Sequence, residues 1–71
     1  MFRRPARQVY LIATTDAHGK TIYRDQYTGF YTHNKYDEDC HFCTYSAALF
    51  HSQGVKPPTV NGTFKIVTEV L

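Results

Sequence analysis

The sequence lacks the residue patterns that commonly carry catalysis. Its glycines, at positions 19, 29, 54 and 62, are scattered and form no phosphate-binding loop. Ser46 and Ser52 stand in an ordinary helical pattern and not in a strand-to-helix nucleophile elbow. The acids at positions 37 to 39 are adjacent, so they do not face each other across a cleft. We therefore predict that the protein is not an enzyme and uses no cofactor.

Long apolar runs and a cysteine framework are missing as well. No stretch approaches the roughly 18 apolar residues that a membrane-spanning helix needs, and no apolar signal-peptide segment follows Met1. Two cysteines and four histidines without a secretory leader fit a reducing compartment. The expectation is a cytoplasmic protein with no membrane partner.

Aromatic side chains, in contrast, are abundant. The chain has six tyrosines and five phenylalanines. A chain of this size buries only about 60% of the surface that its unfolded form exposes, so several of these rings are expected at the surface. Tyrosine gives a large, stiff contact at a low cost in entropy and is enriched in binding surfaces. This composition favours a binding protein.

Positive charge is concentrated at the N-terminus. The net charge is +2, and Arg3, Arg4 and Arg7 stand within the first seven residues without an acid among them. From position 8 onward, five basic and six acidic side chains leave the rest of the chain close to neutral. We predict a flexible basic arm over residues 1–7 and a single domain over residues 8–71.

Residue alternation predicts two strands joined by a turn in the first half of the chain. Residues 9–13 are rich in β-branched and aromatic side chains, and Val9 and Leu11 share one face of this strand. Residues 16–19 suit a hairpin connection, with aspartate at the first position and glycine at the last. Residues 21–24 then form the returning strand.

A helix is predicted over residues 35–53. The acids at positions 37 to 39 would favour its N-terminus through the helix macrodipole. Apolar side chains recur at helical spacing after them, and Gly54 is placed to end the helix. The apolar positions of this helix are Phe42, Tyr45, Ala48 and Leu49.

Two further strand segments are expected. The second strand continues in this prediction, bent at Gly29, through residues 30–31, because a glycine inside a strand often marks a bulge. A loop with two prolines over residues 56–62 follows the helix. Residues 63–70 give the clearest strand, since apolar and polar side chains alternate through most of it.

The element order β-β-α-β predicts a small two-layer α+β sandwich. One helix covers one face of a three-stranded antiparallel sheet with strand order 2-1-3, and Val9 and Leu11 are assigned to the core beneath this helix. The uncovered face would carry Tyr10, Ile12, Tyr23 and Val67, and it is too apolar to be left to water without a reason. These four side chains are therefore the predicted protein-binding surface. An edge of the sheet can also pair with a second copy, so a homodimer stays open.

Cys40 and Cys43 form a Cys-x-x-Cys pair, which is typical of zinc sites when two further ligands are near. His33 could join them, but His18 or His41 would then have to supply the fourth ligand. Because the usual second pair of ligands is missing, we predict no metal and expect both cysteines to pack as small apolar side chains. The acids directly before Cys40 raise its pKa, which disfavours a redox role.

Nucleic-acid binding is the first alternative function, and a zinc-stabilised interaction domain is the second. Arg3, Arg4 and Arg7 could contact phosphates, and tyrosines on an open sheet face could stack on bases. The rest of the chain, however, has no basic stripe and no run of alternating basic, glycine and aromatic residues. This makes nucleic acid the less expected partner.

In its size, its β-β-α-β order and its missing catalytic motif, the chain resembles the small proteins that bacteriophages make to bind and disable host enzymes. Inhibitors of host RNA polymerase, anti-CRISPR proteins and other anti-defence proteins belong to this group. The resemblance implies a non-enzymatic inhibitor that occupies the surface of a larger bacterial protein in the host cytoplasm. No residue pattern of a particular family is present, so the resemblance assigns no functional residue.

Overall fold

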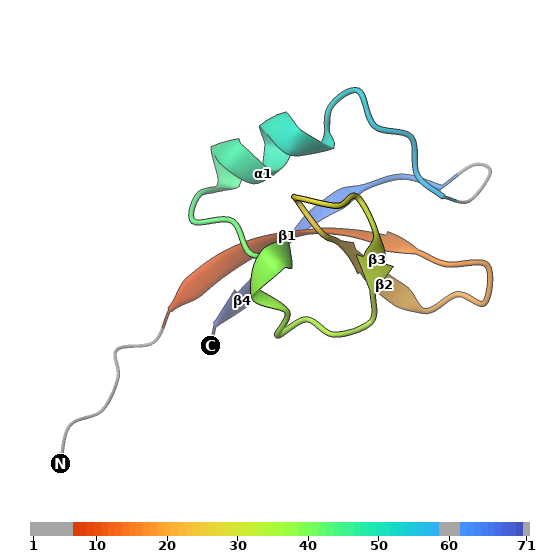
Figure 1. Cartoon of the computed structure of the whole chain (residues 1–71), viewed down its shortest axis with the longest axis horizontal. Helices are drawn as coiled ribbons and strands as arrows, with labels where there is room; N and C mark the ends of the chain where they lie inside the picture. Colours follow the sequence, from red (N-terminus) through yellow and green to blue (C-terminus); the bar gives the residue numbers. More distant parts are fainter. Residues whose placement is uncertain (1–6, 59–61, 71) are drawn as a thin grey trace, which may run out of the picture.

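The computed structural model describes residues 7–58 and 62–70 (Figure 1). The predicted basic arm, with Arg3 and Arg4, therefore lies outside the described residues except for Arg7, which is exposed. None of the described helices combines the length and the apolar character needed to cross a bilayer.

The strands form one four-stranded antiparallel sheet of order β3-β2-β1-β4. β1 (Gln8–Thr15) lies between β2 (Thr21–Arg24) and β4 (Lys65–Val70), and β3 (Tyr31–Thr32) lies outside β2. The predicted α+β class is confirmed, as is the position of the first strand between the second and the last. The prediction of three strands is wrong, because residues 31–32 form a strand of their own.

The turn between β1 and β2 is built on Asp16, as the sequence predicts. Its Oδ1 accepts hydrogen bonds from the backbone N–H groups of His18 and Lys20, both at 2.9 Å. Gly19 has a φ of 81°, a left-handed conformation that costs glycine no steric clash, and its N–H donates to the Asp16 carbonyl at 3.0 Å. The Lys20 N–H and, after it, the His33 ring lower the pKa of the Asp16 carboxyl.

A second turn, on Asp25, separates β2 from β3. The Asp25 Oδ1 accepts from the N–H groups of Tyr27 at 2.7 Å and Thr28 at 3.0 Å, and Gly29 closes the turn with a φ of 76°. The chain then runs back, so that Tyr31 pairs with Arg24. The predicted continuation of the second strand through Gly29 is therefore wrong. The glycine allows a reversal of the chain and not a bulge within one strand.

The predicted helix over residues 35–53 is wrong in its first half. A 3₁₀ turn, η1 (Glu38–Cys40), ends at His41, and α1 begins only at Tyr45 (Tyr45–Ser52). The acids predicted to start the long helix act locally instead, since the Asp37 side chain accepts from the Asp39 N–H at 3.1 Å.

Between η1 and α1 the chain is extended, because it pairs with β1 through the backbone of Phe42. Phe42 and Tyr10 exchange two backbone hydrogen bonds, of 2.8 and 3.0 Å, which no helix could supply to Tyr10. Thr44 then caps α1, with its hydroxyl accepting from the Ala47 N–H at 3.1 Å. At the other end, Gly54 has a φ of 78° and follows the helix, as predicted.

The sheet is covered on both faces, by two separate groups of buried side chains. On one face, Ile12 and Phe42 pack with Ala48 of α1, which lies along this side of the sheet (Figure 1). On the other face, Val9 and Leu11 pack with Cys40 of η1. The prediction that Val9 and Leu11 lie beneath the helix is therefore wrong, since α1 covers the opposite face of β1.

Candidate functional site

The predicted binding face does not exist as one surface. Ile12 is fully buried and, with Tyr10, belongs to the group of side chains that packs with α1. The strand register pairs Ala13 with Tyr23, which places Tyr23 on the opposite face, where it packs with Val67 against Val9 and Leu11. Tyr10, Tyr23 and Val67 are each half-buried. The prediction that the four share an open face is wrong, because alternate residues of β1 point to opposite faces of the sheet.

The exposed apolar surface lies on α1 instead. Its outward side chains are Tyr45, Leu49 and Phe50, with 52%, 40% and 74% of their surface exposed. The small side chains Ala47 and Ala48 pack against the sheet. The helix therefore places its alanines inward and its large apolar side chains outward, which reverses the usual arrangement of a surface helix.

Ring contacts hold this outer surface of α1 in place. The Tyr45 ring meets the Tyr10 ring edge to face, with centroids 6.2 Å apart and planes at 82°. The Phe50 ring meets the His51 ring in the same way at 5.9 Å, and His51 lies 5.1 Å from the buried Phe42 ring. Both ends of the outer surface are thus connected to side chains of the core, which limits the rotamer freedom that a binding partner would have to restrict.

The sequence interpretation missed this surface because it assigned Tyr45 and Leu49 to the buried stripe of a long helix. The signal that could have found it is the adjacent pair Ala47 and Ala48 in a short helix. Two alanines allow a helix to lie close to a sheet, and the larger neighbours then have to point away.

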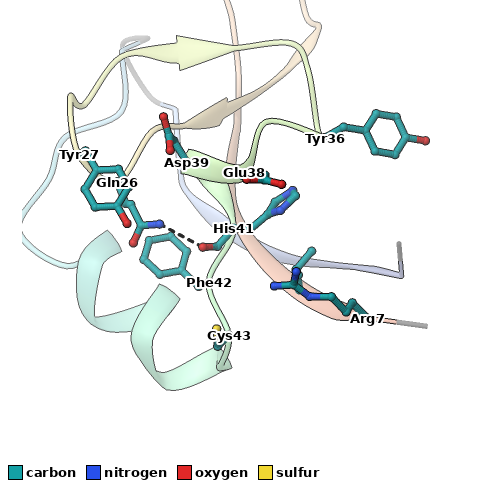
Figure 2. Close-up of a pocket in the computed structure, with 10 residues that line it drawn as sticks. Arg7, Gln26, Tyr27, Tyr36, Glu38, Asp39, His41, Phe42 and Cys43 are labelled. Carbon is teal, nitrogen blue, oxygen red and sulfur yellow. Dashed lines mark hydrogen bonds between the residues drawn. The ribbon is translucent and has the colours of Figure 1, made fainter. Parts of the chain in front are cut away.

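A pocket of about 380 Å³ lies beside η1 and is the second candidate site (Figure 2). Its walls come from the start of β1, the turn after β2, η1 and the extended segment that follows η1. The lining residues are Arg7, Val9, Gln26, Tyr27, Tyr36, Glu38, Asp39, His41, Phe42 and Cys43.

Hydrogen bonds join the segments that form the walls of the pocket. The Gln26 N–H donates to the Asp39 carbonyl at 3.0 Å. The Gln26 side-chain Nε2 donates to the His41 carbonyl at 3.1 Å, and this bond is the dashed line in Figure 2. The His41 Nε2 lies 2.7 Å from the Lys35 carbonyl oxygen. Because a carbonyl can only accept, this nitrogen carries the proton.

The pocket does not assemble a nucleophile with its base. Figure 2 shows the His41 ring pointing away from Cys43, and the His41 Nε2 is already engaged by Lys35. Glu38 and Asp39 are both exposed, and Tyr36 extends outward from the rim. The arrangement offers hydrogen-bonding groups and aromatic rings for contact, without a geometry that fits a particular reaction.

The structure separates the three candidate zinc ligands. Cys40 is fully buried in the apolar core, Cys43 is exposed, and the His33 Nε2 lies 3.1 Å from the Asp16 Oδ2 at the β1–β2 turn. Among residues 7–58 and 62–70, no three histidine, cysteine or acidic side chains gather closely enough to hold a metal ion.

We predict that the purified protein holds no stoichiometric zinc and that a chelator leaves its melting temperature unchanged. A structural zinc ion would couple metal binding to folding, so its removal would unfold the chain. Native mass spectrometry before and after EDTA makes the measurement. One zinc ion per chain, lost together with the fold, would contradict this prediction and bring His33, Cys40 and Cys43 together as ligands.

The two thiols are expected to differ in reactivity by orders of magnitude. Burial, and then the charge of Asp37, raises the pKa of Cys40 to about 11, so at neutral pH this thiol is protonated as well as inaccessible. Cys43 is exposed. Iodoacetamide labelling followed by mass spectrometry should modify Cys43 readily and Cys40 only after unfolding. The Cys43→Ser variant is the matched control, and rapid labelling of that variant in the folded state would contradict the burial of Cys40.

Comparison of the chain with protein-family models, with curated proteins and with solved structures finds no match.

Proposed function

We propose that the protein is a non-enzymatic binding module whose contact surface is the outer face of α1, defined by Tyr45, Leu49 and Phe50. The observation that carries the proposal is the reversed helix, in which Ala48 is buried while Phe50 is 74% exposed. Large apolar side chains of a surface helix usually face the core, whereas here the chain covers only the alanine side of α1. A partner that covers the outer side would complete this burial.

The chemistry of the surface fits a protein partner. Tyr45 and Leu49 are one helical turn apart, at the i and i+4 spacing of the anchors by which a helix binds an apolar groove. Phe50 widens this apolar surface on the far side of the exposed Ser46. Large aromatic side chains provide much of the binding energy in such interfaces. The outer face carries no lysine or arginine, so phosphate contacts do not explain it.

The kind of partner follows from the resemblance to phage inhibitors, which implies a larger bacterial protein such as a host RNA polymerase or a component of a defence system. Inhibition of that partner and a place in the host cytoplasm are parts of the same proposal.

The test is capture of the partner from a bacterial lysate by the immobilised chain, with a nuclease treatment and a salt series. An apolar protein interface should retain its partner after nuclease digestion and respond little to ionic strength. Binding dominated by phosphate contacts weakens steeply with salt. Loss of the captured material after nuclease, together with such a steep response, would contradict the proposal and favour nucleic-acid binding through the arginines of the N-terminal arm.

A further inference from the structure

The outer edge of β4 is open along a six-residue strand. β4 (Lys65–Val70) pairs with β1 on its inner side over all six residues, and no described residue pairs with its other side. Such an edge presents unpaired backbone N–H and C=O groups and is a template for another strand. No proline stands in this strand, and no bulge interrupts its register with β1.

The hydrogen-bond pattern shows which residues of β4 present these groups. Tyr10 exchanges its backbone hydrogen bonds with Phe42 on one side, so its pairing with Thr68 on the other side is of the non-hydrogen-bonded kind. The N–H and C=O groups of Thr68 therefore point outward. By the alternation of an antiparallel ladder, those of Ile66 point outward as well, and those of Val67 point inward to β1.

The side chains of β4 are complementary to themselves in the antiparallel direction. Lys65 and Glu69 stand two residues before and two residues after Val67. If two copies of the strand pair with Val67 opposite Val67, each Lys65 lies opposite a Glu69 of the other copy. In the same register Ile66 lies opposite Thr68, which brings together the two residues whose backbone groups point outward.

We infer that the protein forms a symmetric dimer through β4, in the antiparallel register centred on Val67. The register provides four backbone hydrogen bonds between Ile66 and Thr68 pairs and two opposite-charge pairs between Lys65 and Glu69. Registers that place Lys65 opposite Lys65, or Glu69 opposite Glu69, are disfavoured because like charges then face each other. Charge thus selects one alignment from those that the backbone allows.

The dimer has a geometric consequence for the surface on α1. Directly opposed residues of paired strands point to the same face, so the two sheets join into one and both α1 helices lie on the same side. Two outer faces of α1 would then be presented together. The inference of the dimer does not depend on the proposed function of that surface. The dimer forms through β4, whereas the proposed partner contacts the outer side chains of α1.

A charge exchange between two variants tests both the dimer and its register. Lys65→Glu alone places like charges opposite each other in both pairs, and Glu69→Lys alone does the same. Each variant should dimerise at least about tenfold more weakly than the parent chain. An equal mixture of the two should recover dimers, because each mixed dimer restores two opposite-charge pairs. Sedimentation velocity over a concentration series measures all three.

The effects of each substitution within its own chain are the same in the single-variant samples and in the mixture. Glu69→Lys also removes the ion pair between the Lys35 Nζ and the Glu69 Oε2, 3.5 Å apart, but it does so in the mixture as well as alone. Recovery in the mixture therefore reports the contact between copies. A parent chain that stays monomeric at the highest attainable concentration would overturn the inference, and so would a mixture of folded variants that gains no dimer.

The Thr68→Pro variant provides a second, independent measurement. Its proline removes an N–H group that points away from β1, so the β1–β4 ladder is kept and only the outer edge is blocked. We expect a folded monomer, whereas the matched Thr68→Val variant should dimerise like the parent chain. A Thr68→Pro variant that dimerises as tightly as the parent would place the contact elsewhere, for example on α1, and overturn the inference.

Discussion

Replacing Leu49 and Phe50 together with serine is expected to abolish capture of the partner and to leave the fold intact. Both side chains are exposed, at 40% and 74%, so their truncation removes little from the core. Hot-spot side chains at the centre of an interface cost about 2 kcal/mol or more each when truncated, and a combined loss of about 4 kcal/mol corresponds to a dissociation constant roughly a thousandfold higher. The partner recovered from lysate, titrated against both chains, provides the measurement.

The controls separate this surface from the other exposed aromatic side chains. Tyr27 and Phe30, on the turn between β2 and β3, are 76% and 75% exposed and contribute rings of the same kind. The Tyr27→Ser/Phe30→Ser variant should bind like the parent chain. Circular dichroism and thermal melting first establish that both double variants are folded. Loss of binding in the turn variant and full binding in the α1 variant would move the contact surface to the β2–β3 turn.

The Ile12→Ala variant is expected to lose about 2–5 kcal/mol of unfolding free energy, the usual range when a large core side chain is truncated. The Ile12 side chain, on β1, is fully buried against the alanine side of α1. Total stability at this chain length is on the order of 4–10 kcal/mol, so the loss is a large fraction of it and the variant should unfold at a much lower urea concentration than the parent chain. Urea titration followed by circular dichroism measures the change.

Leu11→Ala should give a loss of the same size, because Leu11 is equally buried on the opposite face, with Cys40. This pair of variants distinguishes a sheet covered on both faces from the predicted sheet with one open face. In the predicted arrangement Ile12 is part of the open face, and its replacement would cost little. A change below about 1 kcal/mol for Ile12→Ala, with a large one for Leu11→Ala, would restore the open face and contradict the packing of α1.

Much of the sheet could be predicted from the sequence because its signals are local. The strand over Gln8–Thr15 follows from its β-branched residues, and the Asp16 turn follows from a carboxylate and a glycine at the required positions. The end of α1 at Gly54 is local in the same sense. In each case residues close in the chain determine the conformation, so no knowledge of distant contacts was needed.

The errors arise where a distant contact decides the structure. The prediction of a long helix is wrong because Phe42 pairs with Tyr10, which is remote in the sequence. This pairing keeps the segment between η1 and α1 extended. The prediction of the sheet face that α1 covers is wrong for a related reason. Alternation places Val9 and Tyr10 on opposite sides of β1, but both sides contain apolar residues, so the pattern alone cannot choose the side that the helix packs against.

The same errors explain why the binding surface was predicted in the wrong place. The predicted helix, more than twice as long as α1, has a continuous buried stripe that included Tyr45 and Leu49. In the short helix only Ala48 is fully buried, and the same residues become the exposed surface. The abundance of aromatic residues predicted a binding protein. Which of the rings are exposed depends on the packing of α1, which the sequence pattern does not reveal.

Site-specific photo-crosslinking tests the central claim, that a protein partner covers the outer face of α1, most directly. A benzoyl-phenylalanine residue replaces Phe50 in one chain and, as the control, the exposed Ala17 of the β1–β2 turn in another. After irradiation with the partner, position 50 should give a discrete crosslinked species whose partner peptide mass spectrometry identifies, and position 17 should give none. Crosslinking from position 17 with none from position 50 would contradict the account.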